Sequence, residues 1–364
     1  MKQPKEMQEE QQPAKGANPL KIMAIVLSSL AAVLVFAAVG LGLFVWYSAD
    51  MRGEMFSESS DPVVRPTISV GQEAETDADW IDEAGNAYNY RDDVISILLM
   101  GTDYMGKEEN WTEGMESNGG NADVLALVIL NTTTFDFDIL YIPRDTMAEV
   151  VMADAAGQYL GTKYTNISAS HSYGDGGALS CRLTSDAVSR LLMGAPVNRY
   201  AALNYDAIIA LNHIMGGIRI TFDSDCTDIC DYFTEGTTVV LSDLYLSMLV
   251  TYRDYEQVDG ATVRGQRIMN VMKAMFDQLK DDLKEDPMIA LDIFNELTDY
   301  ITTDLKLSEI IYLAKNIGKM DFSLDTVIKL PGETGMGEKY AEFHADQEWI
   351  HDFVVEKFCV PAAN

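Results

Sequence analysis

The chain has 364 residues, with 57 Asp and Glu against 26 Lys and Arg, which gives a formal net charge of −31. This acidic excess excludes a nucleic-acid binder and an electrostatic anchor on anionic lipid, because both kinds of protein bind phosphate through Lys and Arg. A hydrophobic content of 48% and a mean hydropathy of −0.03 exclude an acidic disordered chain, so the length predicts one or two folded domains.

An apolar stretch near the N-terminus predicts a single membrane-spanning helix. Residues 22–47 contain no charged side chain and end in Trp46 and Tyr47, whose rings favour the headgroup layer. A cleaved signal peptide is the competing interpretation, but its apolar core is shorter, roughly 7–15 residues, and ends in small residues. Lysines precede the stretch and acidic residues follow it. The positive-inside rule therefore places residues 1–21 in the cytoplasm as a short tail, with the rest of the chain outside the cell membrane.

Composition divides the remaining chain into two parts. Residues 48–90 are rich in Ser, Asp, Glu and Pro, which predicts an extended acidic stalk. Residues 91–364 alternate between strand and helix signals, which predicts one α/β domain with a single mixed sheet covered by helices. The expected strands are 94–101, 123–130, its hairpin partner 137–142, 217–222 and 326–330. The expected helices are 179–193, 205–215, 241–252, 263–284, 287–300, 307–316 and 346–358, and the pattern loosens between Asp145 and the first of them.

Cysteine and histidine give little support for a metal or a nucleophile. The four cysteines include no CxxC pair, so a zinc site is not indicated, and Cys226 and Cys230 form either a disulfide or two thiols. The sequence contains no GxSxG, HExxH or P-loop motif, and its four histidines are scattered. His213 falls inside an apolar predicted helix, where we expect it to pack.

Polar side chains stand at the ends of three predicted strands. Asp103 follows the first strand, Asp123 opens the second, and Arg144 and Asp145 follow the third. Ends of strands are where α/β sheets usually build sites. Carboxylate oxygens suit Mg²⁺, and the planar fork of arginine fits phosphate.

A second polar group surrounds the start of the long predicted helix. It comprises Arg253, Asp259, Arg264 and Arg267. Arg264 and Arg267 share one helix face, since they are three residues apart. The alternative is that each arginine only pairs with a nearby carboxylate such as Asp254 or Glu256. Clustered arginines in so acidic a chain, together with the strand-end aspartates, favour a phosphate site.

The order of these pieces resembles the LytR-CpsA-Psr (LCP) family of membrane-anchored cell-wall enzymes over residues 92–358. The matching pieces are ILLMGTD (97–103), ADVLALVILN (122–131), ILYIPRDT (139–146), KYTNISASHSYGDG (163–176), LNYDAIIALNHIMGGIRIT (203–221), the segment 252–267 and LPGE (330–333). The resemblance implies an LCP-type α/β/α domain. It also implies a phosphotransferase that moves a glycopolymer from a polyprenyl-diphosphate carrier to peptidoglycan or another wall acceptor.

The same resemblance implies roles for individual residues. Asp103 and Asp123 would bind Mg²⁺ at the diphosphate, Asp145 would orient Arg144, and Asp259 would act as a base or position the acceptor. The residues that would hold the phosphates are Arg144, Arg253, Arg264 and Arg267. The apolar helices at 203–215 and 268–276 would line a groove for the polyprenyl chain, although a plain core is the alternative use of these side chains.

Four positions depart from the usual pattern of the family. Asn121 stands where Arg is usual, Val124 where Thr is usual, Tyr255 where an Arg-x-Arg pair has its second Arg, and Ile268 where Gln is usual. These changes imply either a shifted substrate or weakened catalysis. Two other functions therefore stay open: a non-catalytic or regulatory membrane protein that binds a wall ligand, and a polyprenyl-diphosphate hydrolase that uses the same Mg²⁺ and arginines.

Overall fold

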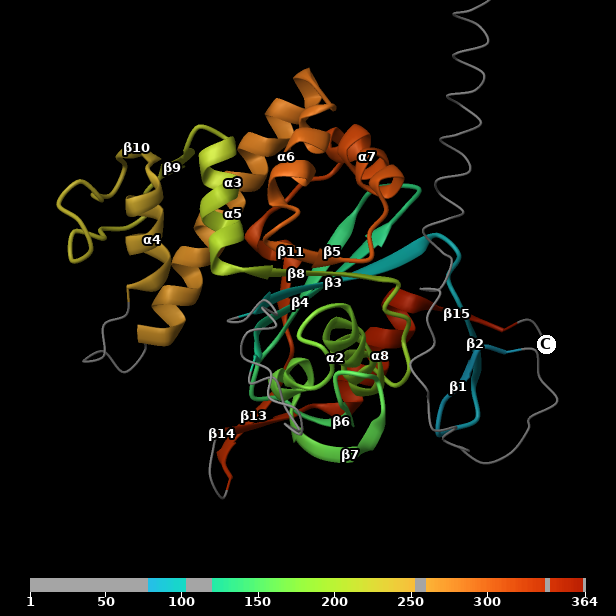
Figure 1. Cartoon of the computed structure of the whole chain (residues 1–364). Helices are drawn as coiled ribbons and strands as arrows, with labels where there is room; N and C mark the ends of the chain where they lie inside the picture. The colour runs from blue at the N-terminus through green and yellow to red at the C-terminus, as the bar shows by residue number, and fades with distance from the viewer. Residues whose placement is uncertain (1–77, 103–119, 253–259, 338–340, 363–364) are drawn as a thin grey trace, which may run out of the picture. The chain divides into compact units, whose positions relative to one another are not determined.

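The structure is a computed structural model that describes residues 78–102, 120–252, 260–337 and 341–362 (Figure 1). The predicted cytoplasmic tail, the predicted membrane span 22–47 and most of the predicted stalk lie outside these residues. Within the described ranges, no helix combines the length and the apolar character needed to cross a membrane.

A six-stranded mixed sheet lies at the centre of the fold, in the order β11-β8-β3-β4-β5-β12 (Figure 1). Its strands are β3 (Val94–Thr102), β4 (Ala122–Asn131), β5 (Phe137–Ile142), β8 (Arg199–Asn204), β11 (Ile301–Thr303) and β12 (Val327–Lys329). The first three form an antiparallel meander, of which the β4–β5 hairpin is predicted from the sequence, while β8 joins β3 and β12 joins β5 in parallel. The near-continuous apolar runs of β3 and β4 suit strands that are covered on both faces.

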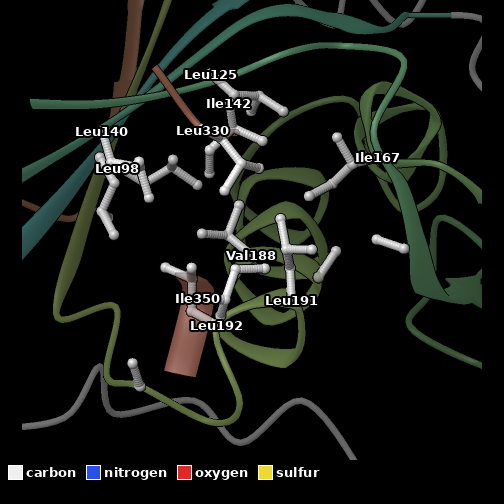
Figure 2. Packing of buried hydrophobic residues seen from close by; sticks show 14 of the residues in the cluster. Leu98, Leu125, Leu140, Ile142, Ile167, Val188, Leu191, Leu192, Leu330 and Ile350 are labelled. Atoms are coloured by element: carbon white, nitrogen blue, oxygen red, sulfur yellow. The ribbon is translucent and has the colours of Figure 1, made fainter. Parts of the chain in front are cut away.

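Helices cover both faces of this sheet. The helices of the described part are α2 (Ala178–Leu191), α3 (Tyr205–Ile214), α4 (Asp243–Thr251), α5 (Gly260–Glu285), α6 (Ile289–Leu297), α7 (Leu307–Asn316) and α8 (Gln347–Phe358), and α2 and α8 lie on the face opposite α5, α6 and α7. On one face, Leu98 and Leu140 pack with Val188 of α2 and Ile350 of α8 in the buried core shown in Figure 2. On the other face, α5, α6 and α7 pack on residues of β3 and β4 that alternate with those of the first core. Since each fully buried aliphatic side chain contributes roughly 1.5–3 kcal/mol, these two cores explain why the meander lies at the centre.

A third apolar cluster joins α3, α4 and part of α5 to the short hairpin β9 (Ile218–Thr221) and β10 (Thr238–Leu241). The α3 helix ends before Gly216 and Gly217, as predicted, and both glycines have positive φ. The expectation that His213 packs in the core is wrong. Its side chain is 82% exposed and lies 3.7 Å from Asp243, because it falls on the outer side of α3 rather than in the core.

The cysteines of this third cluster are thiols. Cys226 and Cys230 are both unpaired, and the amide of Cys230 donates to the carbonyl of Cys226 at 3.3 Å. Burial raises the pKa of the Cys226 thiol, which disfavours the thiolate that nucleophilic chemistry requires.

The expectation that the chain loosens after Asp145 is wrong. β6 (Met147–Ala153) and β7 (Tyr159–Asn166) form an antiparallel hairpin there. β6 is buried or half-buried on both faces except at the exposed Glu149, which pairs with Arg190 at 2.9 Å. β7 is a largely exposed edge strand. Neither strand therefore alternates in the way that reveals a half-buried strand in a sequence.

Several short strands were not predicted from the sequence pattern either. β1 (Trp80–Ile81) and β2 (Ala87–Tyr90) form a three-stranded sheet with β15 (Cys359–Pro361), and β13 (Gly332–Met336) pairs with β14 (Ala341–Ala345). The first two lie in the range predicted as stalk, so ordered secondary structure begins before residue 91.

Candidate phosphate-binding site at one edge of the sheet

Polar residues from neighbouring strands meet at one edge of the central sheet. β3 ends at Thr102 and the parallel β8 ends at Asn204, and these two residues are register partners. Thr102 also pairs with Ala122 across a β-bulge, so Asp123 lies at the same edge. The end of β5 pairs with Leu125, which brings the following Pro143-Arg144-Asp145 segment to the start of β4.

Arg144 links the second and third strand ends. Its Nη1 atom lies 2.6 Å from Oδ1 of Asp123, and its Nε atom lies 3.6 Å from Oδ1 of Asp145. The side chains of Arg144, Asp123 and Asp145 are 49%, 42% and 40% exposed. Ion pairs this exposed contribute little to stability, so the guanidinium can exchange a carboxylate for a phosphate ligand at small cost.

Asp145 has partners from two other parts of the chain. The side-chain amide of Asn166, at the end of β7, donates to Oδ1 of Asp145 at 3.3 Å and to the carbonyl of Ala341 at 3.1 Å. The amide of Phe343 in β14 donates to the carbonyl of Asp145 at 2.9 Å. Sequence reasoning missed Asn166, although it lies in the motif KYTNISASHSYGDG, because its neighbours depend on the β6–β7 hairpin.

Arg267 lies at the junction of α4 and α5. Its Nη2 atom donates to the carbonyl of Tyr252 at 2.6 Å, and its guanidinium carbon lies 5.6 Å from the centre of the Tyr252 ring. Among the described residues, its contacts are this carbonyl and this ring rather than a carboxylate, and its buried Nε–H has no hydrogen-bond partner there. An unpaired buried donor is costly, so this group suits an anionic ligand.

The other predicted site residues are described in part or lie outside the description. Arg264 belongs to α5, one turn before Arg267, but its side chain is outside the described part. Asp103, Arg253 and Asp259 lie outside the described residues altogether. The structure thus brings Asp123, Arg144 and Asp145 together and places Arg267 on α5.

The departures from the family pattern alter the surface beside Arg144. Val124 is 46% exposed, and a Cβ atom at Gly101 would lie 3.0 Å from its Cβ. Asn121 and Ile268 are both partly buried, whereas Tyr255 lies outside the described residues. The edge therefore carries an apolar side chain and an amide near Asp123.

The predicted metal ligands are Asp103 and Asp123, of which the structure describes Asp123. Within the described residues, no three His, Cys, Asp or Glu side chains lie close enough to share a metal ion. Asp123 offers the hard oxygen atoms that Mg²⁺ prefers. Thr102 lies beside Asp123 at this edge of the sheet, and Asp103 is the next residue after Thr102 in the sequence. The donor types fit Mg²⁺, and metal binding by Asp103 and Asp123 remains a prediction.

Solved structures share this fold. Lin1025 protein from Listeria innocua matches with a TM-score of 0.52 and 23% identity, covering 72% of this chain and 96% of its own. A structure described as TagT bound to LIIa-WTA matches with a TM-score of 0.50 and 23% identity, covering 72% of this chain and 89% of its own. These likenesses establish the mixed α/β class of the domain.

The sequence profile of the LytR_cpsA_psr family matches residues 67–355, and the chain belongs to this family. TagT of Bacillus subtilis (strain 168) is 24% identical over 306 residues, covering 83% of this chain and 82% of its own. TagU of Bacillus cereus is 25% identical over 254 residues, covering 69% and 72%. Both relatives are named as polyisoprenyl-teichoic acid–peptidoglycan teichoic acid transferases.

Proposed function

We propose that the protein is a membrane-anchored phosphotransferase. It moves a glycopolymer from a polyprenyl-diphosphate carrier to peptidoglycan or another wall acceptor on the outer side of the cell membrane, with Mg²⁺ at the diphosphate. One observation carries the proposal: Arg144 lies between Asp123 and Asp145 at the edge of the sheet. The names of the teichoic acid transferases support it.

The chemistry needs charge and position rather than a protein nucleophile. An acceptor hydroxyl oxygen bonds to the phosphorus of the glycopolymer phosphate, and the bond from that phosphorus to the polyprenyl phosphate breaks. The hydroxyl proton passes to a base, for which Asp259 is the candidate. Arg144 would bind phosphate oxygens with its planar fork, Asp145 would hold that fork, and Arg253, Arg264 and Arg267 would neutralise the remaining charge. Mg²⁺, when bound by Asp103 and Asp123, would neutralise the diphosphate.

The polyprenyl chain requires an apolar groove next to this edge. The sheet face toward α5 carries the small residues Gly101, Ala126 and Ala201. On the same face Val124 is 46% exposed, although β4 is a central strand. The apolar side chains of Ile208 and Ile209 on α3 are only half-buried. Such incomplete coverage of an apolar face supports a lipid site there.

The test uses the full-length chain in detergent micelles, with a labelled glycopolymer on a polyprenyl-diphosphate carrier, peptidoglycan and Mg²⁺. We expect Arg144→Gln and Asp123→Asn each to slow transfer by about 100-fold or more, because the first removes a positive charge beside the transferred phosphate and the second removes a carboxylate that would hold Mg²⁺ there. Arg190→Gln is the matched control. It removes an arginine that also lies between two carboxylates, Glu149 and Asp186, but outside the sheet edge.

The same assay separates the competing functions. Tight donor binding that survives Arg144→Gln, without any turnover, would show a non-catalytic binding protein. The amide at Asn121 and the apolar side chain at Ile268, in place of the usual Arg and Gln, are the observations that favour that alternative. Release of the polymer into water at the same rate without peptidoglycan would show a hydrolase.

A further inference from the structure

The motif Leu330-Pro331-Gly332-Glu333 has no role in the chemistry proposed above, and the structure suggests another use for it. Leu330 is buried and its amide donates to the carbonyl of Tyr141 at 3.0 Å, which fixes the end of β12 beside β5. Gly332 then starts the β13–β14 hairpin, where a Cβ atom would overlap the carbonyl oxygen of His344. The motif therefore holds this hairpin closely against the segment that follows β5.

The hairpin contacts the Arg144 segment directly. Phe343 is 7% exposed, its amide donates to the carbonyl of Asp145 at 2.9 Å, and it forms a parallel bridge with Thr146. On the other side, the amide of Ile167 donates to the carbonyl of Thr146 at 2.7 Å. The amide of Ser168 donates to the carbonyl of Arg144 at 3.2 Å. The backbone of residues 144–146 is thus held by β14 and by the segment after β7.

The side chain of Asn166 connects β14 and the end of β7 to the carboxylate of Asp145. The amide group of Asn166 has two N–H donors, and both are used: one toward Oδ1 of Asp145 at 3.3 Å and one toward the carbonyl of Ala341 at 3.1 Å. The same Oδ1 atom of Asp145 lies 3.6 Å from Nε of Arg144. Asn166 therefore fixes the oxygen that faces the guanidinium.

We propose that Asn166 is a positioning residue for the donor's phosphates. Its side chain, braced by the β13–β14 hairpin, holds the Asp145 carboxylate so that Arg144 is oriented toward the ligand before the ligand arrives. The inference rests on the proposed function, because it requires Arg144 to bind the diphosphate. The guanidinium is half exposed and paired with Asp123 on one side, so a second fixed carboxylate reduces the rotamers that it samples and the affinity that is lost on ordering.

The test measures the affinity of the full-length chain for geranylgeranyl diphosphate with Mg²⁺ by calorimetry, between about pH 5.5 and about pH 8. Asn166→Ala is expected to weaken binding roughly fivefold at every pH, because it removes the amide without adding charge. Asn166→Asp is expected to weaken it about tenfold at the alkaline end and to recover at the acid end. There the two carboxylates share one proton, which restores a donor toward Asp145.

The control introduces the same change beside another aspartate. The amide of Asn131 donates to Oδ2 of Asp93 at 2.9 Å, at the opposite end of the sheet. Asn131→Asp should leave the affinity and its pH profile unchanged. The other charged and titratable groups on the elements packed around Asn166 are common to all variants: Asp123, Arg144, Glu149, Lys163, His171, Glu333, Glu342 and His344.

Two outcomes overturn the inference in different ways. If Arg144→Gln loses the probe while Asn166→Ala and Asn166→Asp bind it as the wild type does, only the role of Asn166 is wrong. If Arg144→Gln itself binds the probe with unchanged affinity, the proposed function is wrong and the inference falls with it. Weakening of Asn166→Asp that is matched by Asn131→Asp would also overturn it.

Discussion

Two arginine–carboxylate pairs in this protein share their chemistry but differ in burial. Arg144 and Asp123 are nearly half exposed at the edge of the sheet. Arg199 and Glu309 are 3% and 0% exposed, with Nη2 2.7 Å from Oε1, and Glu309 also accepts the amide of Lys306 at 2.7 Å. Because solvent screens the first pair, Arg144 can exchange Asp123 for another anion at small cost in stability. Because the second pair is buried, removing either of its charges leaves the other charge desolvated and lowers stability.

Glu309→Gln is therefore expected to lower the free energy of unfolding by about 3–5 kcal/mol, because it removes the charge of the carboxylate that pairs with the buried Arg199 guanidinium. Asp123→Asn, the matched change at the exposed pair, is expected to cost less than about 1 kcal/mol. Urea denaturation of the full-length variants measures both. Equal losses would show that burial does not separate the two pairs.

At the scale of single elements, the end of α3 depends on two adjacent glycines with different surroundings. Gly216 has a φ of +70° with open space around its α-carbon. Gly217 has a φ of +95°, and a Cβ atom there would lie 2.6 Å from Cγ1 of Val240 and 2.8 Å from the carbonyl oxygen of Leu241. Sequence predicted the turn from the glycine pair, but only the packing of β10 distinguishes the two positions.

Gly216→Ala is expected to cost about 1 kcal/mol of unfolding free energy, the usual penalty of a side chain in the left-handed region. Gly217→Ala is expected to cost about 3 kcal/mol, because the new methyl group also meets the backbone of β10. Chemical denaturation of the two variants in parallel tests this difference. If the two variants lose similar amounts of unfolding free energy, β10 accommodates the new methyl group at position 217 without an energetic penalty.

At the scale of the whole described part, a histidine joins its first and last segments. Nε2 of His351 on α8 lies 3.3 Å from Oδ2 of Asp82, which follows β1, and its ring lies 5.7 Å from that of Trp80. Asp352, and after it Asp82, holds the pKa of His351 above its ordinary value of 6.5. Hydrogen bonds from Asn86 and His351 hold the pKa of Asp82 below its ordinary value of 3.8.

These pKa shifts determine how the free energy of unfolding changes with pH. The contribution of His351 is complete below pH 6.5 and is lost as the pH rises through its higher folded-state pKa. The contribution of Asp82 is lost as the pH falls through its lowered folded-state pKa, below 3.8. We expect His351→Gln to flatten the decline in unfolding free energy between about pH 6 and pH 8. His213→Gln, at a ring that is 82% exposed, is the control. Parallel pH profiles for wild type and His351→Gln would contradict this prediction.

Much of the architecture follows from local sequence. The apolar runs at 94–101 and 123–130 contain enough consecutive aliphatic residues to require burial on both faces, which fixes a central sheet. The helix 307–316 was predicted with the bounds that the structure gives. The strand-end positions of Asp123, Arg144 and Asp145 are likewise predictable, because each residue borders an apolar run that is recognisable by itself.

Only the tertiary structure decided which residues support that site. Asn166 lies 21 residues after Asp145 in the sequence and Ala341 a further 175 residues on, yet the Asn166 side chain donates to both. Their meeting depends on β6, whose side chains are largely buried, and on β14, where Phe343 bridges to Thr146, a residue far away in the sequence. Local propensity carries no information about such pairings, because their free energy comes from surfaces that exist only once the sheet has formed. The sequence by itself determined the anionic composition, the strand-end aspartates and the arginine, and the fold determined how the arginine is held.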